Sequence, residues 1–136
     1  MTLKDFLFHD RVQDERSFGR FVRQRREELG KSVRGFSQEI GITAVYLSDI
    51  ERGNRYAPKA YLEALRTGLQ IPEEDKCAFE DLASASRGFR YEDINPYLGM
   101  QPLARVALRK ARDLNIPDEK WQEFIDGMDS SPKGKG

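Results

Sequence analysis

The chain has 136 residues, of which 34% are charged and 38% hydrophobic, a balance typical of a soluble globular protein. It has no apolar run near the length of about 20 residues that a membrane helix needs, and its first residues lack a signal-peptide pattern. Its single cysteine, Cys77, cannot form an internal disulfide, so we expect a cytoplasmic protein with no membrane partner. The 23 Lys or Arg residues balance 23 Asp or Glu residues, and zero net charge by itself argues against nucleic-acid binding.

The charges are nevertheless unevenly distributed along the chain. Residues 17–60 carry nine Lys or Arg and five Asp or Glu, a net charge of +4, whereas residues 61–98 carry four and eight, a net charge of −4. A positive segment is what contact with phosphates requires. Ordinary scatter of charges along a short segment is the alternative explanation.

The hydrophobic pattern predicts helices from the N-terminus onward and no strand. A first helix is expected over residues 2–8, where Thr2 and Asp5 have the spacing of a capping box, followed by a charged connector over 10–16. The next helix is expected over 18–29. Its apolar face carries Phe18, Phe21, Val22 and Leu29.

Two short helices joined by a turn come next. Ser32 and Thr43 stand where these helices begin, as residues whose side chains accept hydrogen bonds from orphan backbone N–H groups. Gly41 stands just past the first of the two helices, where a left-handed residue ends a helix at little cost. This order and spacing predict a helix-turn-helix.

The second of these helices, over residues 44–52, has two different faces. Leu47 and Ile50 point to one side, where they can be buried. The opposite arc is small and polar, and it consists of Ala44, Val45, Ser48, Asp49 and Arg52. A helix with such an exposed arc fits closely into the major groove of DNA.

Further helices are expected after a loop over residues 53–58. Pro58 suits the first turn of a helix that carries inward-facing Tyr61, Leu62, Leu65 and Leu69. Another helix begins at residues 72–75 and carries Cys77, Phe79, Leu82 and Ala83. We expect Cys77 to be a small buried hydrophobic residue, because no basic cluster near it favours a thiolate.

The C-terminal part combines an irregular segment over residues 91–100, where Asn95-Pro96 signals a turn, with helices over 103–114 and 117–125. Residues 130–136 are expected to be disordered. Two short helices cannot hide all of the apolar side chains of this part against each other, so we expect it to form a dimer interface or to fold back as an intrachain brace. These side chains are Tyr97, Leu98, Leu103, Val106, Leu108, Trp121, Phe124 and Ile125.

The pattern resembles the xenobiotic-response-element (XRE) family of phage-repressor and Cro-like helix-turn-helix regulators. The resemblance covers residues 17–71, and its most specific part is the run Tyr46-Leu47-Ser48-Asp49-Ile50-Glu51-Arg52-Gly53. The Ser32 cap, the turn Gly41-Ile42-Thr43 and Pro58 also match the family pattern. Residues 79–125 look like the tail of some members from Gram-positive bacteria and their mobile elements. The resemblance implies binding to double-stranded DNA, and an ion pair between Arg26 and Glu51 that ties the first domain helix to the recognition helix.

Eleven residues are expected to contact DNA: Ser32, Arg34, Thr43, Ala44, Val45, Tyr46, Ser48, Asp49, Arg52, Asn54 and Arg55. The helix that begins after Ser32 presents backbone N–H groups to a phosphate, and Arg34 substitutes for the glutamine that the family often has where Val33 stands here. The methyl groups of Ala44 and Val45 suit thymine methyls.

Other positions leave alternatives open. Asp49 either accepts a hydrogen bond from a cytosine amine or only excludes phosphate. Arg52, Asn54 and Arg55 suit phosphate contact. For Tyr46, a phosphate hydrogen bond and simple packing are equally plausible.

We therefore expect an all-α protein with a five-helix repressor-like helix-turn-helix bundle. Its expected parts are an N-terminal segment (1–16), the DNA-binding domain (17–83), a helical C-terminal extension (84–129) and a disordered tail (130–136). The expected function is transcriptional repression by a homodimer on a two-fold operator. The alternative is an antitoxin or adaptor whose main role is to bind a protein partner. Because His9 is the only histidine and no nucleophile or phosphate-binding motif is present, we expect no enzymatic activity, no cofactor and no metal.

Overall fold

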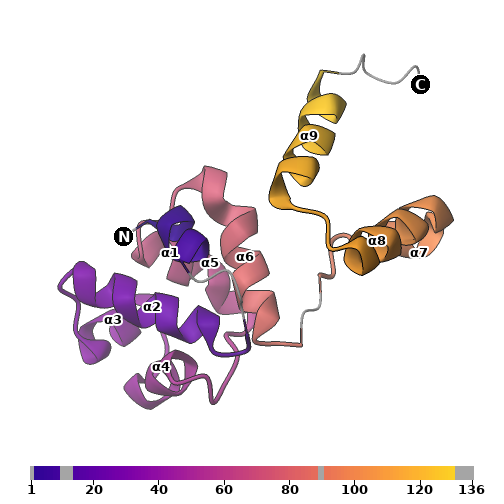
Figure 1. The fold of residues 1–136 in the computed structure, drawn as a ribbon. Helices are drawn as coiled ribbons and strands as arrows, with labels where there is room; N and C mark the ends of the chain where they lie inside the picture. Colours follow the sequence, from indigo (N-terminus) through magenta and orange to yellow (C-terminus); the bar gives the residue numbers. More distant parts are fainter. Residues whose placement is uncertain (1, 10–13, 89–90, 131–136) are drawn as a thin grey trace. The chain divides into compact units, whose positions relative to one another are not determined.

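The computed structural model describes residues 2–9, 14–88 and 91–130, and helices are the only regular secondary structure in this part of the chain, as expected (Figure 1). The chain divides into two units, Met1–Tyr91 and Glu92–Gly136, here called unit 1 and unit 2. In chain order the helices are α1 (Leu3–His9), α2 (Ser17–Glu28), α3 (Val33–Ile40), α4 (Ala44–Glu51), α5 (Lys59–Gly68), the 3-10 turn η1 (Glu73–Asp75), α6 (Lys76–Ala85), α7 (Asn95–Met100), α8 (Pro102–Leu114) and α9 (Asp118–Asp129). No helix in the described ranges is long and apolar enough to cross a membrane.

The helix ends in unit 1 follow the capping residues of the sequence. Ser32 Oγ accepts a hydrogen bond from the Gly35 N–H (3.0 Å), and Thr43 Oγ1 accepts one from the Tyr46 N–H (3.1 Å). Gly41 follows α3 with φ of 83°, the left-handed conformation that favours glycine. Thr2 forms the expected capping box at the start of α1, because its side chain and backbone both bond to Asp5. These local predictions are confirmed.

An aromatic cluster occupies the centre of unit 1. The Phe79 ring on α6 lies 5.3 Å from the Phe18 ring and 6.3 Å from the Phe21 ring of α2, measured between centroids. The Phe6 ring lies 5.2 Å from Phe21, so α1 joins the core of the five-helix bundle formed by α2–α6. The surrounding aliphatic core includes Leu3, Val22, Leu47, Ile50, Leu62, Leu65, Leu69 and Leu82.

A glycine lets α4 lie directly against α2. A β-carbon at Gly19 would lie 2.6 Å from the carbonyl oxygen of Glu51 and closer still to that of Ile50. No side chain fits in that space, so the backbones of the two helices are in contact at this point. Gly19 was not singled out in the sequence, although a glycine inside a helical pattern often has a packing reason.

A buried ion pair fixes the same pair of helices. Arg26 Nε lies 2.8 Å from Glu51 Oε2 and Arg26 Nη2 lies 3.0 Å from Glu51 Oε1, while Nη1 donates to the Lys31 carbonyl oxygen at 2.7 Å. Both side chains are buried. The hydrogen bonds to Glu51 raise the pKa of Arg26 above its ordinary value. The ion pair that the family resemblance implied is therefore present, and it orients α4 on α2.

Two expectations about local structure are wrong. Cys77 is exposed, because it lies on the side of α6 opposite to the buried residues Phe79, Leu82 and Ala83, about 200° from Phe79 around the helix. The segment expected to be irregular contains α7, in which Pro96 occupies the first turn, a position where proline is tolerated because its missing N–H needs no partner.

Smaller differences concern helix ends and residues outside the described ranges. Pro58 lies at the position before the first residue of α5, not in its first turn, and α9 continues four residues past the expected end at Ile125. Most of the expected connector (10–13) and of the disordered tail (131–136) lies outside the described residues, and so does the side chain of His9.

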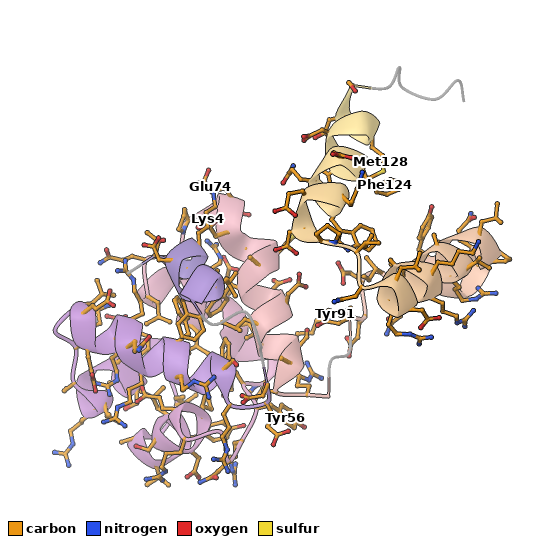
Figure 2. All side chains as sticks on the ribbon, viewed as in Figure 1. Lys4, Tyr56, Glu74, Tyr91, Phe124 and Met128 are labelled. Atoms are coloured by element: carbon orange, nitrogen blue, oxygen red, sulfur yellow. The ribbon has the colours of Figure 1, made fainter. Side chains whose placement is uncertain are left out.

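Unit 2 leaves its apolar side chains exposed. Helix α7 packs against α8, yet none of residues 92–130 is buried. Phe124 and Met128, one turn apart, lie on the same side of α9 (Figure 2) and are 59% and 55% exposed. The other large apolar side chains that are exposed in this unit are Ile94, Tyr97, Met100, Leu103, Val106, Leu108, Leu114 and Ile125.

Candidate nucleic-acid interface

Helix α4, the expected recognition helix, has the two faces that its sequence predicts. Leu47 and Ile50 are fully buried, whereas Val45 is 70% exposed. Ala44 and Ser48 are partly buried on the exposed side, and Thr43 caps the helix from an exposed position. The outward surface of α4 is therefore made of small side chains, which is the shape that close approach to a DNA groove requires.

Asp49 is the organising residue at the end of α4. Its Oδ1 lies 3.0 Å from Arg52 Nη2 and its Oδ2 lies 3.9 Å from Arg55 Nε. Its carbonyl oxygen accepts hydrogen bonds from the backbone N–H groups of Asn54 (2.9 Å) and Arg55 (3.3 Å). Asp49 thus holds the two arginines and the turn that carries them, a role the sequence analysis did not consider.

Tyr46 supports the second of these arginines. The Arg55 guanidinium lies 4.8 Å from the centroid of the Tyr46 ring, a cation–π arrangement. The ring is partly buried and packs against the hydrophobic core. Of the two roles considered for Tyr46, packing is present in the structure, and phosphate contact stays a prediction.

The start of α3 provides a separate basic position. Ser32 and Arg34 are both exposed there, and Ser32 uses its hydroxyl to cap the helix. The Arg34 carbonyl oxygen accepts a hydrogen bond from Ser37 Oγ (2.8 Å). An exposed arginine beside the N-terminus of a helix favours an anion at this point, because the helix dipole and the guanidinium have the same sign.

A depression lies next to the loop that follows α4. Its lining residues are Tyr46, Gly53, Asn54, Arg55, Tyr56, Pro58 and Ser86. Tyr56 is exposed, and the Arg87 guanidinium lies 5.2 Å from its ring centroid. The sequence analysis assigned no role to Tyr56 or Arg87, because nothing local in the sequence brings the end of α6 to this loop.

The expected residues thus fall into two groups in the structure. Those of α4 and the following loop adjoin one another and form one surface, whereas Ser32 and Arg34 belong to the start of α3. Along the described parts of the chain, no three His, Cys, Asp or Glu residues cluster in a way that would hold a metal ion.

Comparison with known proteins agrees with this geometry. Residues 17–78, which span α2 to the beginning of α6, match the family model of the helix-turn-helix domain. A search of curated proteins and a search of solved structures returned no match. The family match and the structure together show that residues 17–78 form a helix-turn-helix domain.

Proposed function

We propose that the protein is a sequence-specific DNA-binding transcriptional repressor of the phage-repressor type. The single observation that carries this proposal is the outward surface of α4, where small side chains are followed directly by Arg52, Asn54 and Arg55. Small side chains allow the helix to enter the major groove, and the arginines neutralise phosphates at its rim. A protein bound in this way across a promoter excludes RNA polymerase.

The residues of α4 suit different parts of the DNA. Val45 and Ala44 lie at the start of the helix and present methyl groups that suit thymine. Asp49 is already paired with two arginines, so orienting them for phosphate contact is the role we assign to it in preference to cytosine recognition. Few direct hydrogen bonds to bases are then available, and DNA shape supplies part of the specificity.

A dimer follows from the size of the recognition helix. Helix α4 has eight residues, a length of about 12 Å, and covers only a few base pairs. Two copies on a two-fold site double the contacts and the specificity. We therefore propose that the protein binds an inverted repeat as a homodimer, from a cytoplasmic location.

The charges of unit 2 favour a second copy as the partner of its exposed apolar surface. Helix α8 carries four Lys or Arg and one Asp, whereas α9 carries five Asp or Glu and one Lys. Each copy thus provides two helices with exposed apolar side chains, of which α8 is basic and α9 is acidic. Packing α8 of one copy on α9 of the other buries both apolar faces and brings opposite charges together twice, as two-fold symmetry requires.

A protein-binding adaptor or antitoxin is the second candidate, and the same exposed side chains of unit 2 favour it, because large exposed apolar patches mark interaction sites in general. Under this reading unit 2 would bind a different protein, and the isolated chain would stay monomeric.

Selection of bound sequences from a random DNA pool tests the proposal. We expect enrichment of an inverted repeat whose half-sites are spaced by about one helical turn, or roughly 10 base pairs. Full-length protein should sediment as a dimer, and a chain that ends at Tyr91 should sediment as a monomer and lose its preference for the full repeat over a half-site. If no sequence is enriched, the repressor proposal fails. If a site is enriched but the free and the DNA-bound protein both stay monomeric, the dimer proposal fails and the adaptor role of unit 2 is favoured.

A further inference from the structure

Two arginines near the recognition helix are held in the same way. The Arg55 guanidinium lies 4.8 Å from the ring centroid of Tyr46, and the Arg87 guanidinium lies 5.2 Å from that of Tyr56. An aromatic face restrains a guanidinium through its π-face and leaves the N–H groups at the edge of the group directed elsewhere. A guanidinium fixed in this way is preorganised for a planar acceptor such as a phosphate.

The two pairs belong to one continuous surface. Tyr46, Arg55 and Tyr56 line the depression beside the loop after α4, and Ser86, which also lines it, directly precedes Arg87. Figure 2 shows Tyr56 at the end of unit 1 opposite to Glu74, which precedes α6. The series of contacts runs from α4 across the loop to Arg87, two residues past the end of α6, entirely within unit 1.

The end of a helix normally repels anions, because its last carbonyl groups carry partial negative charge. In α6 these groups are already bonded within the chain. The carbonyl oxygens of Ala83, Ser84 and Ala85 accept hydrogen bonds from the next backbone N–H groups at 3.1, 3.0 and 3.4 Å, respectively. The Ser86 hydroxyl also donates to the Ala83 carbonyl oxygen. These three carbonyl groups therefore all have a donor within the chain, and Arg87 follows them as the basic side chain beside Tyr56.

We propose that Arg87 and Tyr56 form a second phosphate-binding position for the DNA backbone, adjacent to the position formed by Asn54 and Arg55. This inference rests on the proposed DNA-binding function and extends its contact surface from the recognition helix to the end of α6. Duplex DNA presents a phosphate charge about every 1.7 Å along its axis, so a protein that contacts one phosphate has others within reach beside it. The ligand is the sugar–phosphate backbone, and the contact carries no base specificity.

Salt dependence of binding measures this contact directly. The full-length parent protein and its Arg87→Ala and Arg87→Lys variants are each titrated against a fluorescent duplex of arbitrary sequence, at salt concentrations between about 50 and 200 mM. Lys76→Ala is the matched control, because it removes a positive charge at the other end of α6, about 16 Å away along the helix. Arg52→Ala/Arg55→Ala serves as the positive control for loss of phosphate contacts, and thermal unfolding followed by circular dichroism checks that each variant is folded.

We expect Arg87→Ala to make the slope of log Kobs against log salt shallower by about 0.9, and Arg87→Lys and Lys76→Ala to keep the parental slope. In a Tyr56→Ala background, Arg87→Ala should have a smaller effect on affinity, since the ring no longer fixes the guanidinium. If Arg87→Ala lowers the unfolding temperature, Arg87→Gln provides the same charge removal with the length of the side chain retained. The inference is overturned if a folded Arg87→Ala or Arg87→Gln variant keeps the parental slope while the Arg52→Ala/Arg55→Ala variant has a shallower one. The proposed function is not contradicted by that result. Absence of binding by the parent protein overturns both.

Discussion

The buried pair between Arg26 and Glu51 offers the sharpest test of how unit 1 holds its recognition helix. Replacing Glu51 by leucine removes both acceptors, at 2.8 and 3.0 Å, from a buried guanidinium. Arg26 would retain the Lys31 carbonyl oxygen at 2.7 Å and the exposed Glu27 carboxylate at 3.9 Å, but it would lose its buried counter-charge. Breaking a buried ion pair from one side costs about 3–5 kcal/mol, because the remaining charge stays buried and uncompensated.

This loss is large for a domain of this size. At roughly 4–8 °C per kcal/mol, Glu51→Leu should lower the midpoint of thermal unfolding by at least about 12 °C. Thermal and urea unfolding of the full chain, followed by circular dichroism, measure the change. Because residues 92–130 contain no buried side chain, the cooperative transition reports on unit 1.

The double variant Arg26→Met/Glu51→Leu separates the cost of burying Arg26 without Glu51 from the net contribution of the ion pair to stability. An apolar pair of similar volume removes the uncompensated charge, and the double variant should recover most of the lost stability. It should remain about 1 kcal/mol below the parent, because the Lys31 carbonyl oxygen loses a donor. The reasoning is refuted if the free energy of unfolding of Glu51→Leu lies within about 1 kcal/mol of that of the parent. It is also refuted if the double variant is as unstable as Glu51→Leu.

Three further predictions use other assays. Gly19→Ala should destabilise unit 1 by about 1–3 kcal/mol in urea unfolding, because the added β-carbon overlaps the backbone of α4. Gly99→Ala is the control, because its β-carbon meets nothing within 4 Å, and equal losses of stability in the two variants would contradict the close approach of α2 and α4. Hydrogen bonding to Arg66 lowers the pKa of Glu63 below its ordinary value of 4.5, so this interaction stabilises the fold above that pH and is lost as the pH falls through the lower folded-state pKa. Glu63→Gln should therefore reduce the difference in urea midpoint between neutral and acidic pH. An unchanged difference would contradict a stabilising role for the Glu63–Arg66 interaction. Replacing thymine by uracil throughout a selected site should weaken binding by about 1 kcal/mol per contacted position if Val45 reads thymine methyls, and no loss in a binding titration would exclude this readout.

Features with short-range causes could be predicted from the sequence. The caps at Ser32 and Thr43, the left-handed Gly41 and the inward-facing pair Leu47 and Ile50 each depend on neighbours within one or two helical turns. The structure places them as expected.

Of the features that depend on contacts between distant segments, the Arg26–Glu51 pair was expected from the family resemblance alone, and others were missed. Gly19 matters because α4 lies against it, and Arg87 adjoins the loop after α4 because it contacts Tyr56 just past the end of α6. No local pattern encodes either contact. Two other features had local signals. The position of Cys77 on its helix relative to Phe79 was misjudged, and the three- and six-residue spacing that lets Asp49 reach both following arginines was missed.

The central claim is that the surface formed by α4 and the loop after it binds DNA. The most direct test compares the parent protein with Arg52→Ala/Arg55→Ala on its selected site, with binding measured by fluorescence anisotropy as a function of salt. The account predicts weaker binding at every salt concentration and a slope of log Kobs against log salt that is shallower by about 1.8, that is, about 0.9 for each lost phosphate contact. Parental affinity and an unchanged slope in the folded double variant would contradict the claim.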